Sequence, residues 1–482
     1  MGAIVAVVSK CDKNVIETAN IMLKVLEHEG VESFGLGSSA IVSVGNSVES
    51  LQDHNMSSCE LVGHVSSRIS MLDAPQPLRL SYGTLVFEGR VYSCDTEGSS
   101  ARFISEKLNE SRRNVEAFIK DFDGSFAFAL AELGGLVVGR DCLGTHPLYY
   151  GENSDVIAFA SERKALWKIG VEKVHPFPAG HLANIDKYGF RFKHVKTLAY
   201  RETKHTTIQA AAKNLKRLLQ QSVSRGLETS EEISLAFSGG LDSSIIAQVA
   251  KNLGADIDLV FVSLEKQAEI EHAKKAAEAL ELPFHIQLYE EKEVEKDLRK
   301  VLWLIEESNP VQASIAIPVF WIAENASKTG FSVLLAGQGA DELFAGYERY
   351  LNDYVNYGPE YTRKKIFDDV KNMCKTNFER DSKICSYHNL ELRLPFATCD
   401  LAEFALSLPL HLKIAPSRNR LRKIVLRRLA KDIGLPDFIV EKPKKAIQYG
   451  TGVNNVLKKL AKTAGYSADE YLQREFEQVF EE

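Results

Sequence analysis

The residues best suited to do chemistry form one short loop, Ser238-Gly239-Gly240-Leu241-Asp242-Ser243-Ser244. A predicted β-strand ends just before it at Phe237, and a predicted helix begins near Ser244. Glycine lets backbone N–H groups close around an anion, the serine hydroxyls add donors, and a helix N-terminus carries partial positive charge. The loop therefore predicts a phosphate site. Its spacing differs from G-x-x-x-x-G-K-S/T, which excludes a Walker loop.

Two aspartates follow predicted strands of the same sheet. Asp242 would repel a bare phosphate, so its place in the loop favours a bridging Mg²⁺. Asp341 lies in a second turn, Gly337-Gln338-Gly339-Ala340-Asp341-Glu342, directly after an apolar run at 333–336. Parallel strands end at one edge of a sheet, so we expect Asp242 and Asp341 to share the ion. Taken alone, either turn also fits an ordinary helix cap, and the pairing favours the metal site.

Two basic stretches lie near the C-terminus. Lys442-Pro443-Lys444-Lys445 precedes the glycine-rich run at 448–452, where a lysine could stabilise a phosphoryl group whose charge grows during reaction. Surface lysines are usually only solvated, so this cluster alone is weak evidence. The stretch from Arg418 to Arg428 carries apolar residues at helical spacing and is predicted to be the solvated face of a helix.

Composition limits the possible classes of protein. The 482 residues predict two domains, and 45% hydrophobic with 26% charged residues is typical of a globular chain. The net charge of −6, without a dominant basic block, disfavours nucleic-acid binding. No run approaches the ~18 apolar residues of a membrane span. Seven cysteines without a CxxC pair fit a reducing compartment, so we expect a cytoplasmic protein without a membrane partner.

The pattern of predicted elements changes near 203–207. Before this point, short β-rich runs predominate, with helices expected only at 14–29 and 101–107, which predicts stacked sheets with helices outside. After it, predicted strands alternate with helices, which indicates a parallel sheet with helical cover. These strands are expected at 233–237, 258–263, 284–288 and 332–336, and the helices at 208–225, 244–252 and 270–280. The chain beyond 347 is predicted to be mostly helical.

Several motifs agree in order and spacing with one known family. In the C-terminal half they are Ser238 to Ser244, Ala336 to Tyr347, Leu390 to Phe396, Phe404 to Pro409, and Lys444 to Gly452. In the N-terminal half they are Asp123 to Ala129, Gly139 to Gly144 with Pro147 to Tyr149, Ala160 to Glu162, and Phe177 to Gly180. On these motifs the chain resembles the glutamine-dependent asparagine synthetase family along nearly its whole length.

The resemblance implies an α+β N-terminal sandwich and an α/β C-terminal domain. The first, residues 1–200, would be a sandwich of two antiparallel sheets of the Ntn amidotransferase type. The second, residues 208–482, would be a PP-loop ATP pyrophosphatase domain with a parallel sheet. In that family the side-chain carboxylate of aspartate attacks the α-phosphate of ATP, pyrophosphate leaves, and ammonia displaces AMP. The resemblance also suggests a homodimer.

The resemblance carries roles over to particular residues. Asp242 and Asp341 would hold Mg²⁺, and Lys444 would stabilise the transition state, with Lys445 the alternative if the alignment slips by one. The residues that would bind ATP and pyrophosphate are Phe237, Ser238, Gly239, Gly240, Leu241, Asp242, Ser243, Ser244, Val262, Ala336 and Gly337.

The N-terminal half departs from the family at the glutaminase site. Glutaminase chemistry needs a Cys exposed after Met removal, and Gly2 stands in that place. The family's HRGPD is His28-Glu29-Gly30-Val31-Glu32 here, which loses the Arg that would pair the substrate carboxylate. Its NGEIYN corresponds to Glu88 through Ser93, and its acidic GSDCE turn has no counterpart. We therefore predict that glutaminase activity is lost and that free ammonia, or ammonia from a separate protein, supplies the nitrogen.

The synthetase half departs near the acceptor substrate. Gln338 stands where the family often has Glu, and Gln can orient a nucleophile but cannot take its proton. An Arg common in the family is missing around Ser314. Three alternatives therefore stay open: an adenylating ligase for another carboxylate, such as a β-lactam-synthetase-like enzyme, a non-catalytic family member, and a disfavoured tRNA-modifying PP-loop enzyme.

Overall fold

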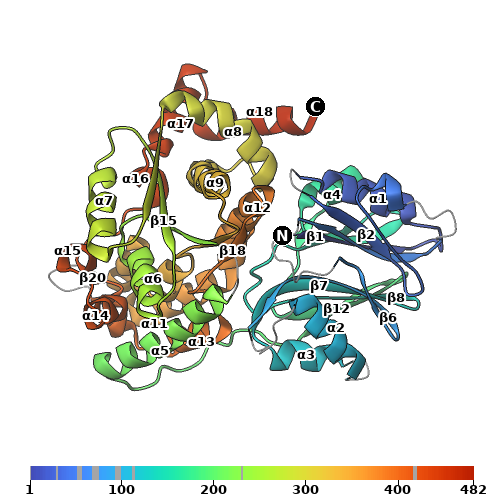
Figure 1. The fold of residues 1–482 in the computed structure, drawn as a ribbon, viewed down its shortest axis with the longest axis horizontal. Coiled ribbons are helices and arrows are strands. Elements are labelled where there is room, and N and C mark those ends of the chain that lie inside the picture. The colour runs from blue at the N-terminus through green and yellow to red at the C-terminus, as the bar shows by residue number, and fades with distance from the viewer. Residues whose placement is uncertain are drawn as a thin grey trace. The chain divides into compact units, whose positions relative to one another are not determined.

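The computed structural model describes residues 2–28, 31–51, 57–67, 75–92, 99–110, 114–228, 232–415 and 421–481, and only the backbone of residue 481. These residues divide into two compact units, Met1–Leu198 and Ala199–Glu482 (Figure 1). Among the described residues, no helix combines the length and the apolar character that crossing a membrane requires.

The first unit contains two antiparallel sheets, as the resemblance predicted. The described strands of one sheet run in the order β11-β9-β10-β1-β4-β2-β3, and those of the other in the order β13-β12-β8-β7-β6-β5. The first sheet comprises β1 (Gly2–Ser9), β2 (Ser33–Gly37), β3 (Val42–Gly45), β4 (Glu60–Ser66), β9 (Tyr149–Glu152), β10 (Val156–Ala160) and β11 (His175–Pro176). The second comprises β5 (Leu78–Leu80), β6 (Gly83–Val91), β7 (Gly124–Glu132), β8 (Gly135–Arg140), β12 (His181–Asp186) and β13 (Gly189–His194).

Side-chain alternation along the strands separates the layers of this unit. Ile4 and Ala6 of β1 face a core shared with Val86 and Ala129 of the other sheet, so the two sheets pack on each other. Neighbouring residues of β1 face the opposite way, against a core under α1 (Ile16–Val25) and α4 (Arg163–Lys168). The helices α2 (Ser100–Glu110) and α3 (Val115–Asp121) cover the outer face of the second sheet. The short helices α3 and α4 were not predicted, so the expectation of only two helices in this half is wrong.

The second unit is built on a parallel sheet, also as predicted. Its strand order is β16-β15-β14-β17-β18, and every described pair is parallel. Four of its strands lie close to the predicted positions: β14 (Ile233–Ala236), β15 (Asp258–Leu264), β16 (Phe284–Tyr289) and β17 (Val333–Leu335). The fifth, β18 (Glu391–Arg393), was not predicted. Because β14 lies between β15 and β17, the loops after β14 and β17 emerge side by side at the edge where such sheets bind ligands.

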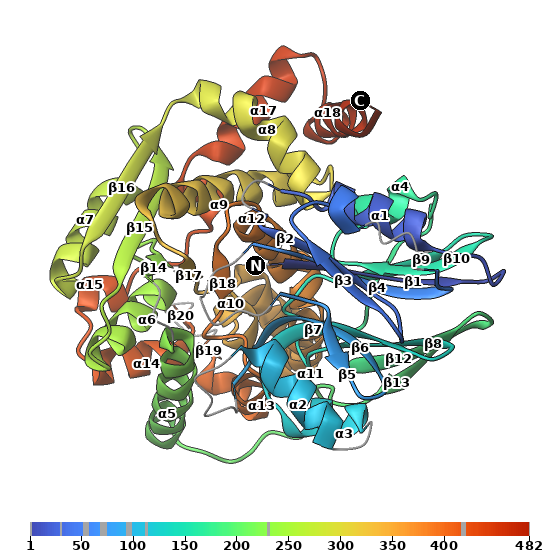
Figure 2. The same cartoon turned by 45° about the vertical axis from the view of Figure 1, so that its right-hand side comes forward.

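Helices cover both faces of the parallel sheet (Figure 2). One side carries α5 (Ile208–Leu227), α6 (Leu241–Asn252) and α7 (Glu269–Leu280), and the other carries α8 (Glu291–Ile305) and α9 (Pro310–Thr329). Strand β15 is buried on both faces, since Val260 and Val262 pack under α8 and α9 while Phe261 packs against α7. Local signals set the boundaries of α9: the Asn309 side chain accepts hydrogen bonds at its start, and Gly330 ends it in a left-handed conformation.

The remainder of this unit is mainly helical. Its helical elements are α10 (Ala340–Leu343), α11 (Glu348–Met373), a π-helical turn (Cys374–Phe378), α12 (Glu379–Tyr387), α13 (Cys399–Ser407), α14 (Ile424–Asp432), α15 (Asp437–Val440), α16 (Ile447–Gly450), α17 (Val453–Thr463) and α18 (Ala468–Glu481). A small hairpin of β19 (Ile414–Ala415) and β20 (Leu421–Arg422) precedes α14.

A buried ion pair between α8 and α12 gives a stability prediction. Lys383 Nζ lies 2.5 Å from Glu306 Oε2, and both side chains are at most 2% exposed. Replacing one partner leaves the other charge buried, so we expect Lys383→Met to lower the free energy of unfolding by about 3–5 kcal/mol. Chemical denaturation of the single variant and of the Lys383→Met/Glu306→Leu double variant tests this. The double variant should recover much of the loss, and a single variant as stable as the native chain would contradict the prediction.

Candidate active site

The loop after β14 has a backbone that requires glycine. Gly239 has a φ of +64°, and a Cβ added there would lie 2.9 Å from the Cα of Ala273. The imidazole of His272 on α7 lies 2.8 Å, Nε2 to O, from the carbonyl of Gly239 and so ties the loop to that helix. The tight turn brings the chain from β14 directly to the N-terminus of α6.

The N-terminus of α6 is open to an anion. Helix α6 begins at Leu241, three residues earlier than predicted, and no side chain caps it. The Ser238 and Ser243 hydroxyls lie 3.3 Å apart, while Ser244 is fully buried and its hydroxyl has no partner in the part of the chain that is described. Free N–H groups at a helix N-terminus, with hydroxyls beside them, suit phosphate oxygens.

The two aspartate loops contact each other. A Cβ on Gly337 would lie 3.3 Å from the Cβ of Asp242, so the turns after β14 and β17 pack closely. Asp242 Oδ2 lies 2.5 Å, and Asp341 Oδ1 2.6 Å, from one atom, the Nζ of Lys423. The structure thus brings both predicted metal ligands to a single cation.

The shared cation, Lys423, is a site residue that the sequence analysis missed. It is 3% exposed and has a φ of +58°, between β20 and α14. The prediction that the basic stretch is one solvated helix face is therefore wrong: the helix begins at Ile424, and Lys423 turns inward to the aspartates. Arg418 lies outside the described residues. A lysine directly before an amphipathic helix was the only local signal.

The structure separates the two candidate catalytic lysines. Lys444 Nζ lies 2.8 Å from Asp341 Oδ2, whereas Lys445 Nζ lies 3.3 Å from Glu269 Oε1. Lys442 also pairs with Glu269, at 2.6 Å. Only Lys444 of this basic cluster reaches the aspartates.

Charge compensation controls ionisation at this site. Burial alone would raise the pKa of the Asp341 carboxyl, but the charges of Lys423 and Lys444 outweigh it and lower that pKa below the ordinary range. Burial alone would likewise lower the pKa of Lys444, and the charges of Asp341 and Asp242 raise it instead. The ionised forms are therefore favoured over a wide pH range.

The residues present fit a divalent cation. Asp242 Oδ1 is a buried carboxylate oxygen without a hydrogen-bond partner among the described residues. Within the same residues, no group of three His, Cys, Asp or Glu side chains could bind a metal by itself. Two carboxylates are the usual protein contribution to Mg²⁺ when phosphate and water oxygens complete the shell.

The residues predicted to line the nucleotide lie near the carboxyl edge of the sheet. Phe237 and Ala336 directly follow β14 and β17, and Val262 lies on β15. All three are at most 8% exposed, and the Phe237 amide donates to the Val260 carbonyl across the sheet. They can thus form an apolar floor beside the loop at 238–244.

A buried polar network holds Gln338, next to the aspartates. Its amide nitrogen donates to Asp381 Oδ2 at 2.6 Å, and Asp381 in turn pairs with Arg380 at 2.7 Å. Arg380 also donates to Gln312 Oε1 at 2.7 Å. A guanidinium therefore reaches the α9 segment from α12, although the Arg expected within that segment is missing.

The place of the predicted glutaminase nucleophile is filled by backbone and side chains. A Cβ on Gly2 would lie 2.5 Å from the carbonyl oxygen of Val65 and 2.6 Å from Glu88. Glu88 Oε1 accepts from the Gly2 amide at 2.9 Å, and Glu88 Oε2 lies 3.2 Å from His64. Burial opposes ionisation of Glu88, but the hydrogen bond from His64 and the positive charges of the N-terminal amino group, His64 and His146 outweigh it and lower the pKa of Glu88 to about 2. Glu29, Gly30 and Ser93, which belong to the compared motifs, lie outside the described residues.

Other matched motifs of the first unit have structural contacts. The buried guanidinium of Arg140 donates to the carbonyls of Phe177 and Gly144, at 2.9 and 2.7 Å. His28 lies 2.8 Å from Glu162, which joins two of the compared stretches. These residues can keep the fold of the unit whether or not it hydrolyses glutamine.

The fold and the site together define a two-part protein whose α/β unit presents a glycine- and serine-rich loop and two aspartates at one sheet edge. The Asparagine synthase family model matches residues 214–367 and 358–480, and the Glutamine amidotransferase domain model matches residues 74–168. This chain therefore belongs to the asparagine synthase family. Membership supports an ATP-dependent ligase that forms an amide from small-molecule substrates.

Relatives from three organisms resemble the chain at moderate identity. A Methanocaldococcus jannaschii protein, assigned by name as an asparagine synthetase (glutamine-hydrolyzing), is 29% identical, with 92% of this chain and 93% of that protein covered. Asparagine synthetase (glutamine-hydrolyzing) 1 of Arabidopsis thaliana is 28% identical, over 70% of this chain and 59% of its own length. The Gallus gallus asparagine synthetase (glutamine-hydrolyzing) is 24% identical, over 80% of this chain and 76% of its own.

Proposed function

We propose that this protein is an AMP-forming ligase that adenylates the side-chain carboxylate of aspartate and amidates it with ammonia. The observation that carries the proposal is the convergence of Asp242 and Asp341 on one cation, with Lys444 on the second oxygen of Asp341. A protein that only kept the fold for partner contact would have no use for this charged arrangement.

In the first step, a carboxylate oxygen of aspartate forms a bond to the α-phosphorus of ATP while the bond to the β-phosphate bridge breaks. The loop at 238–244 receives the departing pyrophosphate through backbone N–H groups and hydroxyls. Lys444, and Lys423 beside it, stabilise charge that develops on the phosphates. Mg²⁺ held by Asp242 and Asp341 would supply neutralisation of that charge.

In the second step, ammonia attacks the acyl carbon and AMP leaves with one carboxylate oxygen. Gln338 can accept a hydrogen bond from the nitrogen through its carbonyl oxygen, since its amide N–H is engaged by Asp381. It cannot take the proton, which therefore passes to water or to the departing phosphate. The buried guanidinium of Arg380, which donates to Asp381 and Gln312, helps to hold Gln338 in this orientation.

The experiment that tests this function is ATP–pyrophosphate exchange with the purified chain and Mg²⁺. We expect exchange that depends on aspartate and is lost when aspartate is omitted. If only another carboxylic acid stimulated exchange, that acid and not aspartate would be the acceptor. If no acid stimulated exchange, the result would favour a non-catalytic family member.

We also propose that the first unit has lost glutaminase activity. Support comes from the crowding at Gly2 and from the buried, ionised Glu88, whose negative charge would oppose an oxyanion. We expect no glutamate from glutamine, and Gly2→Cys should not restore it. The added Cβ would lie 2.5 Å from a backbone carbonyl oxygen, so the variant should also have a free energy of unfolding lower by about 1–3 kcal/mol.

An amino-acid analysis of glutamate released from glutamine checks this prediction. Ammonia-dependent activity of the native chain, measured in the same preparation, shows that the enzyme is folded and active. Stoichiometric glutamate from the native chain would overturn the proposed loss.

A further inference from the structure

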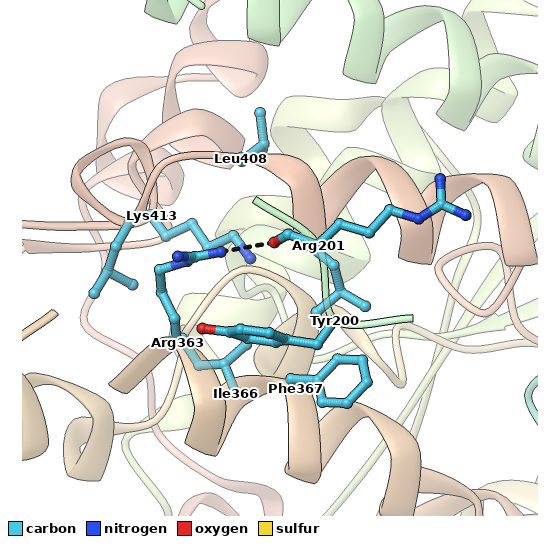
Figure 3. A pocket seen from close by; sticks show the side chains of 9 residues that line it. Tyr200, Arg201, Arg363, Ile366, Phe367, Leu408 and Lys413 are labelled. Carbon is cyan, nitrogen blue, oxygen red and sulfur yellow. Dashed lines mark hydrogen bonds between the residues drawn. The ribbon is translucent and has the colours of Figure 1, made fainter. Parts of the chain in front are cut away.

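A pocket in the second unit lies among residues that the proposed reaction does not use (Figure 3). Its walls come from the segment at Tyr200 and Arg201, from α11, from the end of α13, and from Lys413. None of the lining residues belongs to the candidate active site.

Lys413 is buried in this pocket, and its side chain has no partner among the residues that the structure describes. The residue is 3% exposed, and among the described residues neither a hydrogen bond nor an acidic group acts on its ammonium. Leu406, Leu408 and Leu410 supply apolar walls beside it. Keeping an unpaired ammonium in such surroundings costs free energy, and an anion beside it would offset that cost.

A second cation points into the same space. Arg363 on α11 donates to the carbonyl of Arg201 at 2.8 Å, and its guanidinium lies 5.1 Å from the centre of the Tyr200 ring. Its only acidic partner among the described residues is Glu360, whose side chain is 71% exposed. Figure 3 shows the side chains of Lys413 and Arg363 approaching each other from different segments.

The two charges disfavour each other in the pocket as it stands. Burial, together with the charge of Arg363, lowers the pKa of Lys413 to about 7. A negatively charged ligand between the two would relieve both the repulsion and the missing hydrogen bonds. Arginine and lysine are the side chains that most often bind carboxylate and phosphate oxygens.

We propose that this pocket is a binding site for a small oxyanion, of the phosphate or carboxylate class, held between Lys413 and Arg363. The site lies at the base of the hairpin that carries Lys423. The Ile424 amide donates to the Lys413 carbonyl at 3.1 Å, so the two ends of the hairpin are joined by a backbone hydrogen bond. An occupied pocket would therefore steady the segment that brings Lys423 to the aspartates.

Thermal unfolding of the full chain tests the proposal. Sodium phosphate is titrated against sodium chloride of equal ionic strength, with sodium acetate as the carboxylate arm. We expect a saturable rise in Tm of about 2–4 °C with phosphate or acetate beyond the chloride effect. Phosphate could also bind at the loop at 238–244. The Lys413 variants described next distinguish the two sites, because they change only the pocket.

Lys413→Met is the decisive variant, and Arg201→Gln is its matched control. Without phosphate, Lys413→Met should melt at the same temperature as the native chain or higher, because it removes an unpaired buried charge, and its anion-dependent rise should be smaller. Lys413→Gln, which keeps a polar group, should lose the same response. Arg201→Gln should respond like the native chain, since the Arg201 side chain points away from the pocket in Figure 3.

Three results would overturn the proposal. An anion response identical in the native chain and both Lys413 variants would place the binding elsewhere. If chloride raised the Tm as much as phosphate and acetate do, the effect would be general ionic screening and not binding of an oxyanion. A fall in Tm of both Lys413 variants in chloride alone would show that Lys413 stabilises the fold without an anion.

Discussion

Replacing Lys444 with methionine is expected to lower aspartate-dependent pyrophosphate release by about two to three orders of magnitude, the usual effect of removing a donor aimed at transition-state charge. Lys444 lies against Asp341, and the attraction of both aspartates raises its pKa. The side chain therefore carries a permanent positive charge where the phosphate charge would develop. Steady-state assays that separate kcat from KM for ATP measure the effect, which should fall mainly on kcat.

Lys445→Met is the matched control for that variant. It removes the same group from the next residue, but Lys445 pairs with Glu269 and not with either aspartate. Its activity should stay within a few-fold of the native chain. If Lys445→Met lost more activity than Lys444→Met, the assignment of the catalytic lysine would be reversed.

Exchanging either aspartate for asparagine should abolish Mg²⁺-dependent turnover, with a loss of about three orders of magnitude, because the lost charge no longer helps to hold the metal. The two variants should differ in stability. Asp341 forms ion pairs with both Lys423 and Lys444, whereas the ion pair of Asp242 among the described residues is with Lys423. Asp341→Asn should therefore lower the free energy of unfolding by about 3–5 kcal/mol, and Asp242→Asn by less.

Glu342→Gln controls for the loss of a carboxylate beside Asp341. The same oxygen, Glu342 Oε1, accepts from Tyr347 and Asn377, and a glutamine carbonyl can replace it. Activity and Tm should stay near the native values. Full Mg²⁺-dependent activity in Asp341→Asn would exclude this residue from the metal site.

The sequence predicted the parts of this structure that depend on local patterns. A glycine pair between an apolar strand and a helix defines the turn at 238–240, and alternation of strands and helices defines the parallel sheet. Because parallel strands end at a common edge, the closeness of Asp242 and Asp341 followed from topology alone. The structure agrees, because a single atom, Lys423 Nζ, contacts both carboxylates.

The parts that were missed depend on contacts between distant segments. Lys423 reaches Asp242 across 181 positions of sequence, and its positive φ lies between a two-residue strand and a helix. Strand β18 has three residues and forms only by pairing with β17. The short helices α3 and α4 carry too few residues for a clear period and are stabilised by packing on the sheets. No local propensity encodes such partners.

Transfer of oxygen from labelled aspartate tests the central claim most directly. Aspartate carrying ¹⁸O in its side-chain carboxylate is incubated with ATP, Mg²⁺, ammonia and the purified chain, and the nucleotide product is analysed by mass spectrometry. The proposed reaction predicts AMP that contains one ¹⁸O atom, together with unlabelled pyrophosphate. Unlabelled AMP, or label in inorganic phosphate with ADP as the nucleotide product, would contradict adenylation of the aspartate carboxylate.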